Sequence, residues 1–198
     1  MAIRANLKPY IEGYNSDNSN GWSYDLSLGE EVYITSEKEP KILTPQEPYV
    51  SIRPGDFALL ITDESISVPA ECMAFISVKF TYKQKGLINI SGFHVDPKYK
   101  GKIIFSVYNA GPNDILLKLQ EPVFMIFYEE LGFSCDEKRK SYDHIPVTMI
   151  SEIRGQSSSL AENRQKIEEL EHEMKLYGSI AIAIIITLLG IILTKVLR

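Results

Sequence analysis

The sequence predicts an all-β body followed by a helical C-terminal part. Between roughly residues 20 and 131, apolar and polar residues alternate with a period of two, which is typical of strands with one buried face. Turn-forming residues interrupt this alternation at short intervals. Many short strands of this kind favour a distorted β-barrel, sandwich or jelly roll. Strands do not alternate with helices, and GxGxxG and GxxxxGKS/T are both missing, which disfavours a Rossmann domain.

The clearest alternation runs over residues 76–83, and it resumes over 87–91. Further segments with strand-like composition are 31–35, 57–62, 103–108, 115–119 and 123–128. Turn motifs separate the strands, at 53–56, 68–70, 96–98, 110–114 and 120–122. We therefore predict one β-domain over residues 1–131.

Residues 132–150 are polar at first and then apolar, and we interpret them as a connector whose end, 145–150, adds an edge strand. Apolar residues then recur every seven positions from Ile153 to Met174, with Leu170 and Tyr177 at the later intermediate positions. This heptad pattern predicts a stalk helix over 151–175. The stalk is either a coiled coil or a single amphipathic helix that lies against the body.

Residues 176–194 are 19 consecutive uncharged residues between Lys175 and Lys195. At about 1.5 Å per helical residue, this length comes close to the roughly 30 Å of a bilayer's hydrocarbon. A buried core helix is the alternative, but it would normally keep a polar stripe. We predict a transmembrane helix in the lipid bilayer, followed by a basic tail at 195–198. Because no secretory signal precedes it, the β-domain is expected in the cytoplasm, on a single-pass membrane protein.

Composition excludes several classes of function. The chain has 21 Lys and Arg against 26 Asp and Glu, and this net charge of −5 argues against a nucleic-acid polymer as partner. Cys72 and Cys135 lie far apart in no CxxC pattern, and the three histidines are scattered. We therefore predict neither a disulfide framework nor a metal site.

Three segments carry a family resemblance: GWSYDLSLG at 21–29, RPGDFALLITDESISVPAE at 53–71, and GLINISGFHVDPKYKGKIIFSVYN at 86–109. The first is similar to the initial strand of the dCTP deaminases, and the second to their RPGxxxLxxTxExxxxP segment. The third resembles the pocket hairpin shared by dCTP deaminases and trimeric dUTPases. The resemblance to this superfamily runs from about residue 21 to residue 131. It implies a dUTPase-like β-barrel and a homotrimer with pockets between subunits.

Within the hairpin, the resemblance gives Asp96 the place of the dUTPase aspartate that orients the attacking water, and Tyr99 the place of an aromatic that packs on deoxyribose. A carboxylate can hold and deprotonate water, and a ring face can fill the space of a 2′-hydroxyl. We predict Asp96 as the catalytic candidate. The predicted nucleotide-binding residues are Lys79, Gly92, Phe93, His94, Asp96, Tyr99 and Gly101. The alternative is that Asp96 only starts a turn and Tyr99 only packs in it.

Other residues that the resemblance implies are missing. The deaminase RSSxxR-type motif corresponds to KFTYKQ at 79–84, where Phe80 replaces a serine and Gln84 replaces the active-site arginine. Ser106 stands where the deaminases carry a proton-shuttling glutamate, and serine cannot shuttle protons near neutral pH. The dUTPase PRSGLA motif and glycine-rich C-terminal arm are missing too. The lysines near the hairpins, Lys83, Lys85, Lys98, Lys100 and Lys102, either bind phosphates or are solvated strand-edge residues.

We therefore expect a membrane-anchored, trimeric module that binds or senses a pyrimidine nucleotide without the usual catalytic residues. One alternative is an active dCTP deaminase or dUTP pyrophosphatase that uses Asp96. Another is a structural membrane scaffold whose pocket is filled by side chains such as Phe80 and Phe93. No cofactor is predicted, and Mg²⁺ is expected only together with a bound nucleoside triphosphate.

Overall fold

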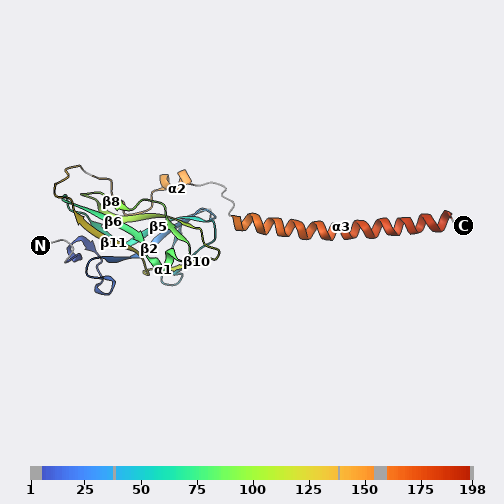
Figure 1. Cartoon of the computed structure of the whole chain (residues 1–198), viewed down its shortest axis with the longest axis horizontal. Helices are drawn as coiled ribbons and strands as arrows, with labels where there is room; N and C mark the ends of the chain where they lie inside the picture. The colour runs from blue at the N-terminus through green and yellow to red at the C-terminus, as the bar shows by residue number, and fades with distance from the viewer. Residues whose placement is uncertain (1–5, 38, 138, 154–159, 197–198) are drawn as a thin grey trace. The chain divides into compact units, whose positions relative to one another are not determined.

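The computed structural model describes residues 6–37, 39–137, 139–153 and 160–196 of the chain. It divides into two units, Met1–Ser157 and Ser158–Arg198. The first unit contains the strands of the described residues and the short helices α1 (Phe80–Lys83) and α2 (Val147–Ile153). The second consists of the helix α3 (Leu160–Val196) (Figure 1). Each unit is described by itself.

The first unit is built on one large sheet with the strand order β7-β9-β5-β2-β11-β6-β8, to which β1 adds beside β5 and β3 beside β2. A separate pair is formed by β10 and β4, and the paired strands are antiparallel throughout. The strands are β1 (Ile11–Glu12), β2 (Tyr24–Ile34), β3 (Lys41–Ile42), β4 (Tyr49–Ile52), β5 (Phe57–Ser67), β6 (Cys72–Val78), β7 (Leu87–Asn89), β8 (His94–Val95), β9 (Lys100–Asn109), β10 (Ile115–Lys118) and β11 (Pro122–Glu130).

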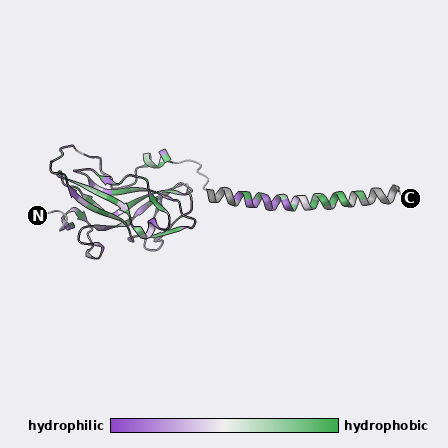
Figure 2. Cartoon of the chain, viewed as in Figure 1, coloured by the Kyte–Doolittle hydropathy of each residue, from purple (hydrophilic) through white to green (hydrophobic). Residues whose placement is uncertain are grey.

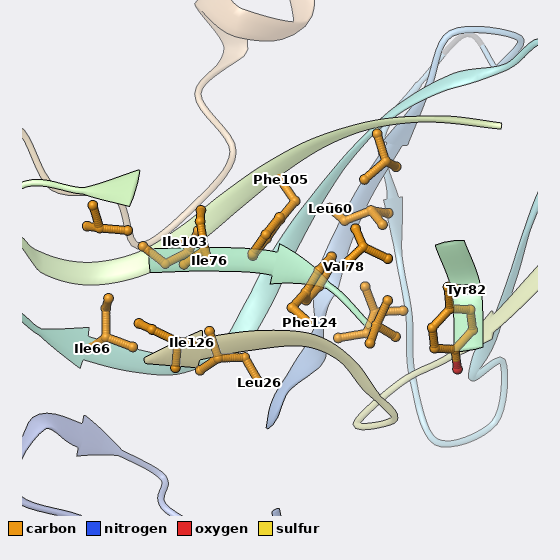
Figure 3. Packing of buried hydrophobic residues seen from close by; sticks show 14 of the residues in the cluster. Leu26, Leu60, Ile66, Ile76, Val78, Tyr82, Ile103, Phe105, Phe124 and Ile126 are labelled. Atoms are coloured by element: carbon orange, nitrogen blue, oxygen red, sulfur yellow. The ribbon is translucent and has the colours of Figure 1, made fainter. Parts of the chain in front are cut away.

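The sheet bends over its own inner face, as the contact between Phe105 and Phe124 shows. These rings stack with centroids 3.8 Å apart, although β5 and β2 separate their strands in the sheet. Figure 3 shows both rings in the middle of the core, with Leu26, Leu60 and Ile126 around them. The protein is therefore mostly β, with a sheet curved like half a barrel and its core on the concave side.

The predicted strands at 57–62, 103–108, 115–119 and 123–128 correspond to β5, β9, β10 and β11. The strand predicted over 76–83 is too long, because β6 ends at Val78 and α1 follows. Within α1, Tyr82 is buried whereas Phe80 is 74% exposed. Apolar and polar residues thus keep alternating in the sequence beyond Val78, although buried and exposed side chains no longer alternate there.

The edge strand predicted at 145–150 is wrong, since this segment leads into helix α2. Ile145 and Ile150 are buried against Tyr33, Leu59 and Ile61, in a second apolar cluster on the outer face of β2 and β5. The apolar residues of the segment therefore cover the face of the sheet and do not extend its edge. A helix does this well because it satisfies its own backbone hydrogen bonds.

Helix α3 corrects the C-terminal prediction. Among the helices of the described residues, none is both long and apolar enough to cross a membrane. The predicted transmembrane helix at 176–194 is therefore wrong, and so is the membrane localisation that depended on it. The prediction counted uncharged residues, and residues such as Gly178 and Ser179 are uncharged without being strongly apolar. Figure 2 shows that a hydrophilic stretch of α3 precedes its hydrophobic stretch.

Candidate functional site

A cavity of about 510 Å³ lies beside the turn that joins β8 to β9, and we call it the hairpin cavity. The predicted residues His94, Asp96 and Tyr99 line it together with Ser106 on β9. Its remaining lining comes from Ile76, Ser91, Val95, Ile103, Ile104, Arg139, Lys140, Tyr142 and Met149. The volume falls within the range of small-molecule sites, about 300–1,000 Å³. The mixture of apolar walls and a few converging polar groups is also typical of such sites.

Asp96 is the central polar group of the hairpin cavity. Its Oδ1 lies 3.6 Å from His94 Nε2, and its Oδ2 lies 3.2 Å from Arg139 Nε. Asp96 also starts a turn, because its carbonyl accepts a hydrogen bond from the Tyr99 backbone nitrogen at 3.3 Å. The turn is thus made by the backbone, while the carboxylate is directed to a histidine and an arginine. This arrangement can hold and orient a water molecule or a polar ligand group.

Tyr99 is 8% exposed and contributes its ring to both the core and the cavity wall. Its hydroxyl donates a hydrogen bond to the carbonyl oxygen of Lys102. Burial is the main cause that raises the Tyr99 pKa to about 12. The neutral phenol is therefore the form present at physiological pH, and its hydroxyl is bound to the Lys102 carbonyl.

Residues 139–150 fold back over the strands and close one side of the hairpin cavity. The carbonyl of Tyr142 accepts a hydrogen bond from the Lys102 backbone nitrogen on β9 at 2.7 Å. Farther along, Glu31 Oε2 accepts the backbone N–H of Ile145 at 2.7 Å, and Glu31 Oε1 pairs with His144. These contacts fix the connector on the sheet, so Arg139 is placed in the cavity by tertiary structure.

The remaining predicted residues do not all meet at this cavity. Gly92 and Phe93 line a different cavity of about 440 Å³ beside β7. Gly101 lines a third, of about 410 Å³. Lys79 forms an ion pair with Asp25 and lines none of these three. The sequence prediction therefore joined residues that the fold distributes over several surfaces.

Several lining residues were missed from the sequence, above all Arg139, Tyr142 and Met149. They lie in the segment interpreted as a connector. No pattern in the sequence of that segment indicates which strands it contacts. The available signal was the charged run before Tyr142, in which an arginine and a lysine precede an aromatic residue. Among the described residues, no group of three or more His, Cys, Asp and Glu side chains is placed to hold a metal ion.

Comparison with known proteins identifies the family to which this chain belongs. The model of the dCTP deaminase-like family matches residues 2–131, which is more than half of the chain. The chain therefore belongs to the dCTP deaminase-like family, and the resemblance seen in its motifs is confirmed.

The curated relatives called dCTP deaminase include those of Pyrococcus abyssi and Wigglesworthia glossinidia brevipalpis. That of Pyrococcus abyssi is 26% identical over 126 residues, which are 61% of this chain and 76% of that protein. That of Wigglesworthia glossinidia brevipalpis is 30% identical over 122 residues, which are 61% of this chain and 56% of the relative. The crystal structure of 2'-deoxycytidine 5'-triphosphate deaminase from Agrobacterium tumefaciens matches with a TM-score of 0.52 at 14% identity. That match covers 61% of this chain and 43% of the other, and it shows a shared fold.

Proposed function

We propose that this protein binds a pyrimidine nucleotide in the hairpin cavity and does not deaminate it. The observation that carries the proposal is the position of Ser106, which lines the same cavity as Asp96. By the family resemblance, this is the place of the glutamate that moves protons at the pyrimidine ring. Deamination replaces an amino group by an oxygen from water and releases ammonia, so it needs a group that both accepts and donates protons. A serine hydroxyl does not supply one.

By the family resemblance, the uncharged Gln84 takes the place of the arginine that the deaminases use. Gln84 follows α1 directly, is exposed, and lines none of the three cavities. Lys79, which keeps the positive charge of the motif, is held by Asp25. Together with Ser106, these observations support a pocket that has the carboxylate of Asp96 but lacks two groups for cytosine chemistry.

We further propose that the working form is a homotrimer, as the resemblance implies. Four heptad positions of α3 support an assembly through this helix, because the side chains of Ile167, Leu170, Met174 and Tyr177 are all exposed in the single chain. A coiled coil would bury such positions between chains. The part of the heptad pattern at 154–159 lies outside the described residues. Mass measurement in solution tests this assembly, and a monomer at all concentrations would contradict it.

The test of function uses the full-length protein with dCTP, dUTP and deoxycytidine, and it follows melting temperature and product formation in the same samples. We expect at least one nucleotide to stabilise the protein without being converted. A ligand at about 100 times its dissociation constant adds close to 2.7 kcal/mol to the free energy of unfolding. Conversion at ordinary enzyme rates, on the order of 1 to 1,000 per second, would refute the proposal.

A second candidate function, hydrolysis of a nucleotide by Asp96, is favoured by one observation. His94 Nε2 lies 3.6 Å from Asp96 Oδ1, and a paired carboxylate and imidazole can together remove a proton from water. This function requires product to form with the native protein. It also requires Asp96→Asn and His94→Gln to abolish product formation while the melting temperature stays within the native range.

The scaffold alternative expected Phe80 and Phe93 to fill the pocket. Both side chains are largely exposed, at 74% and 65%, and neither lines the hairpin cavity. The cavity is therefore free of the side chains that this alternative requires. In the melting experiment, the scaffold alternative predicts no stabilisation by any nucleotide.

A further inference from the structure

The cavity of about 410 Å³ that Gly101 lines shares a lining residue with the hairpin cavity, and we call it the basic cavity. Its cationic side chains are Lys98, Lys100 and Arg139, and its carboxylates are Glu12 and Asp143. Ser65, Gly101 and Ser141 complete its lining. Arg139 lines both cavities, so they meet at this one side chain. A ligand in the hairpin cavity that carries negative charge can thus extend past Arg139 into cationic surroundings.

The guanidinium of Arg139 is placed for a ligand at this junction. Its Nε lies 3.2 Å from Asp96 Oδ2, and its Nη2 lies 3.3 Å from Glu137 Oε2. Within the described residues, the buried Nε makes no hydrogen bond, because its contact with Asp96 does not meet hydrogen-bond geometry. Arginine carries five N–H donors in a fixed plane that suits phosphate oxygens. Arg139 can therefore offer its Nη donors to a phosphate group while its buried Nε stays beside Asp96.

The two lysines are held at the rim of the basic cavity by the β8–β9 turn and the start of β9. Lys98 Nζ donates to the carbonyl of Asp136 at 3.2 Å and pairs with its carboxylate at 3.3 Å. The Asp136 side chain is almost fully exposed, so this ion pair contributes little and exchanges readily for a phosphate. Lys100 lies on β9 opposite Ser67. Both lysines therefore remain available to an anion.

We propose that Arg139, Lys98 and Lys100 form a phosphate subsite for the nucleotide whose base and sugar occupy the hairpin cavity. This inference rests on the proposed function and states where the phosphates lie. It assigns them to the connector and the start of β9, on residues other than the 79–84 segment. Three cations and two carboxylates line the basic cavity, and Arg139 and Lys98 also pair with Asp96, Glu137 and Asp136. The subsite therefore binds a phosphate by letting its oxygens take the place of the exposed carboxylates of Glu137 and Asp136.

The experiment measures dissociation constants of deoxycytidine, dCMP, dCTP, dUTP and inorganic tripolyphosphate for the full-length protein by calorimetry. The variants are Arg139→Gln and Lys100→Gln. Lys118→Gln is the matched control, because it removes one positive charge on β10, where Lys118 lies over the Tyr49 ring and lines neither cavity. Arg139→Lys retains the charge and tests whether the planar guanidinium is required.

We expect affinity of the native protein to rise with the number of phosphates. Arg139→Gln should weaken dCTP and tripolyphosphate binding roughly tenfold, since hydrogen bonds to charged groups contribute strongly. Lys100→Gln should weaken both by about threefold, because its ammonium is more exposed. Deoxycytidine should be affected less than dCTP, and Lys118→Gln should behave as the native protein.

The subsite is refuted if Arg139→Gln and Lys100→Gln bind dCTP and tripolyphosphate as well as Lys118→Gln does. If neither dCTP nor dUTP binds the native protein, the proposed function fails, and tripolyphosphate alone then decides the subsite. Binding of tripolyphosphate that depends on Arg139 keeps the subsite, and no binding overturns it. Melting temperatures confirm that each variant is folded, and Lys100→Gln tests the proposal independently if Arg139→Gln loosens the connector.

Discussion

Glu64 on β5 is joined to Ser27 on β2 by a hydrogen bond in which the Ser27 backbone nitrogen donates to Glu64 Oε2 at 2.8 Å. The Tyr24 hydroxyl donates to the other carboxylate oxygen at 3.2 Å. Glu64 is only 4% exposed, and this burial is the main cause that raises its pKa above the usual range for a carboxyl group. The pair lies just beyond Leu28 and Thr62, where the pairing of β2 with β5 ends, and the carboxylate satisfies the buried backbone donor of Ser27.

The pH dependence of stability follows from Glu64. Because its pKa is raised in the folded state, the folded protein holds this proton more tightly than the unfolded chain does. Its contribution to stability is therefore present below the usual carboxyl pKa and is lost as pH rises through the raised value. Glu64→Gln should reduce this loss of stability with rising pH, because glutamine does not ionise. Urea unfolding measured between about pH 4 and pH 8 covers the range from the ordinary carboxyl pKa upward.

Glu64→Ala is the contrasting variant. It removes the acceptor and leaves the buried Ser27 N–H without its partner, so we expect a loss of about 1–3 kcal/mol at every pH. If the stability of Glu64→Gln depended on pH as that of the native protein does, groups other than Glu64 would be responsible for the pH dependence. Equal stability of the alanine and native proteins would show that the Ser27 contact is unimportant.

Phe105→Ala should be among the most destabilising single changes. Phe105 is fully buried and stacks on Phe124 across the concave side of the sheet. Removing a buried ring costs about 3–5 kcal/mol, because transfer energy and a cavity add up. Phe80→Ala is the matched control, since Phe80 is mostly exposed, and should change stability by less than about 0.5 kcal/mol. Similar denaturant midpoints for the two variants would contradict the packing described for the core.

Gly101→Ala should loosen the connector over the hairpin cavity. Gly101 has a φ of +149°, and a Cβ there would lie 2.7 Å from the carbonyl oxygen of Tyr142. That oxygen accepts the Lys102 backbone N–H, so the clash falls on the contact that holds the connector. We expect a loss of about 1–3 kcal/mol and faster hydrogen exchange of the Lys102 amide.

Gly21→Ala is the control that separates the steric clash with Tyr142 from the strain of placing alanine at a positive φ. Gly21 also has a positive φ, +82°, but a Cβ there meets no atom within 4 Å. This control should lose stability without any change in exchange at Lys102. If the Lys102 amide exchanged at the native rate in both variants, Gly101 would not be needed for the contact between Lys102 and Tyr142.

Glu31→Ala should release the far end of the connector. Glu31 accepts the backbone N–H of Ile145, which is buried in the second apolar cluster with α2. An unpaired buried donor costs about 1–3 kcal/mol, so the connector should open more often. Proteolysis of the native and variant proteins measures this opening. Glu30→Ala is the neighbouring control, because the Glu30 side chain is exposed, and it should be cleaved at the native rate. Equal cleavage of both variants would contradict the anchoring role.

The β-domain and part of its site could be predicted from sequence because they depend on local pattern. The alternation over 103–108 directs Phe105 inward and Ile104 and Ser106 outward, and β9 has this arrangement. Asp96 and Tyr99 lie three residues apart in one turn, and both line the hairpin cavity. The same approach failed at 80–83 and at 145–150, where apolar letters were correct but the type of element was not.

The side of the cavity formed by the connector required the folded chain. Arg139 meets Asp96 because Tyr142 is held by Lys102 and Ile145 by Glu31, and these partners lie far apart along the chain. The alternation of apolar and polar residues and the turn motifs are local features, so they locate strands in the sequence. The net charge argues against a class of binding partner, the nucleic-acid polymers. Hydrogen bonds and burial between distant segments choose among many possible pairings, and only the complete packing of the sheet selects the one that assembles this site.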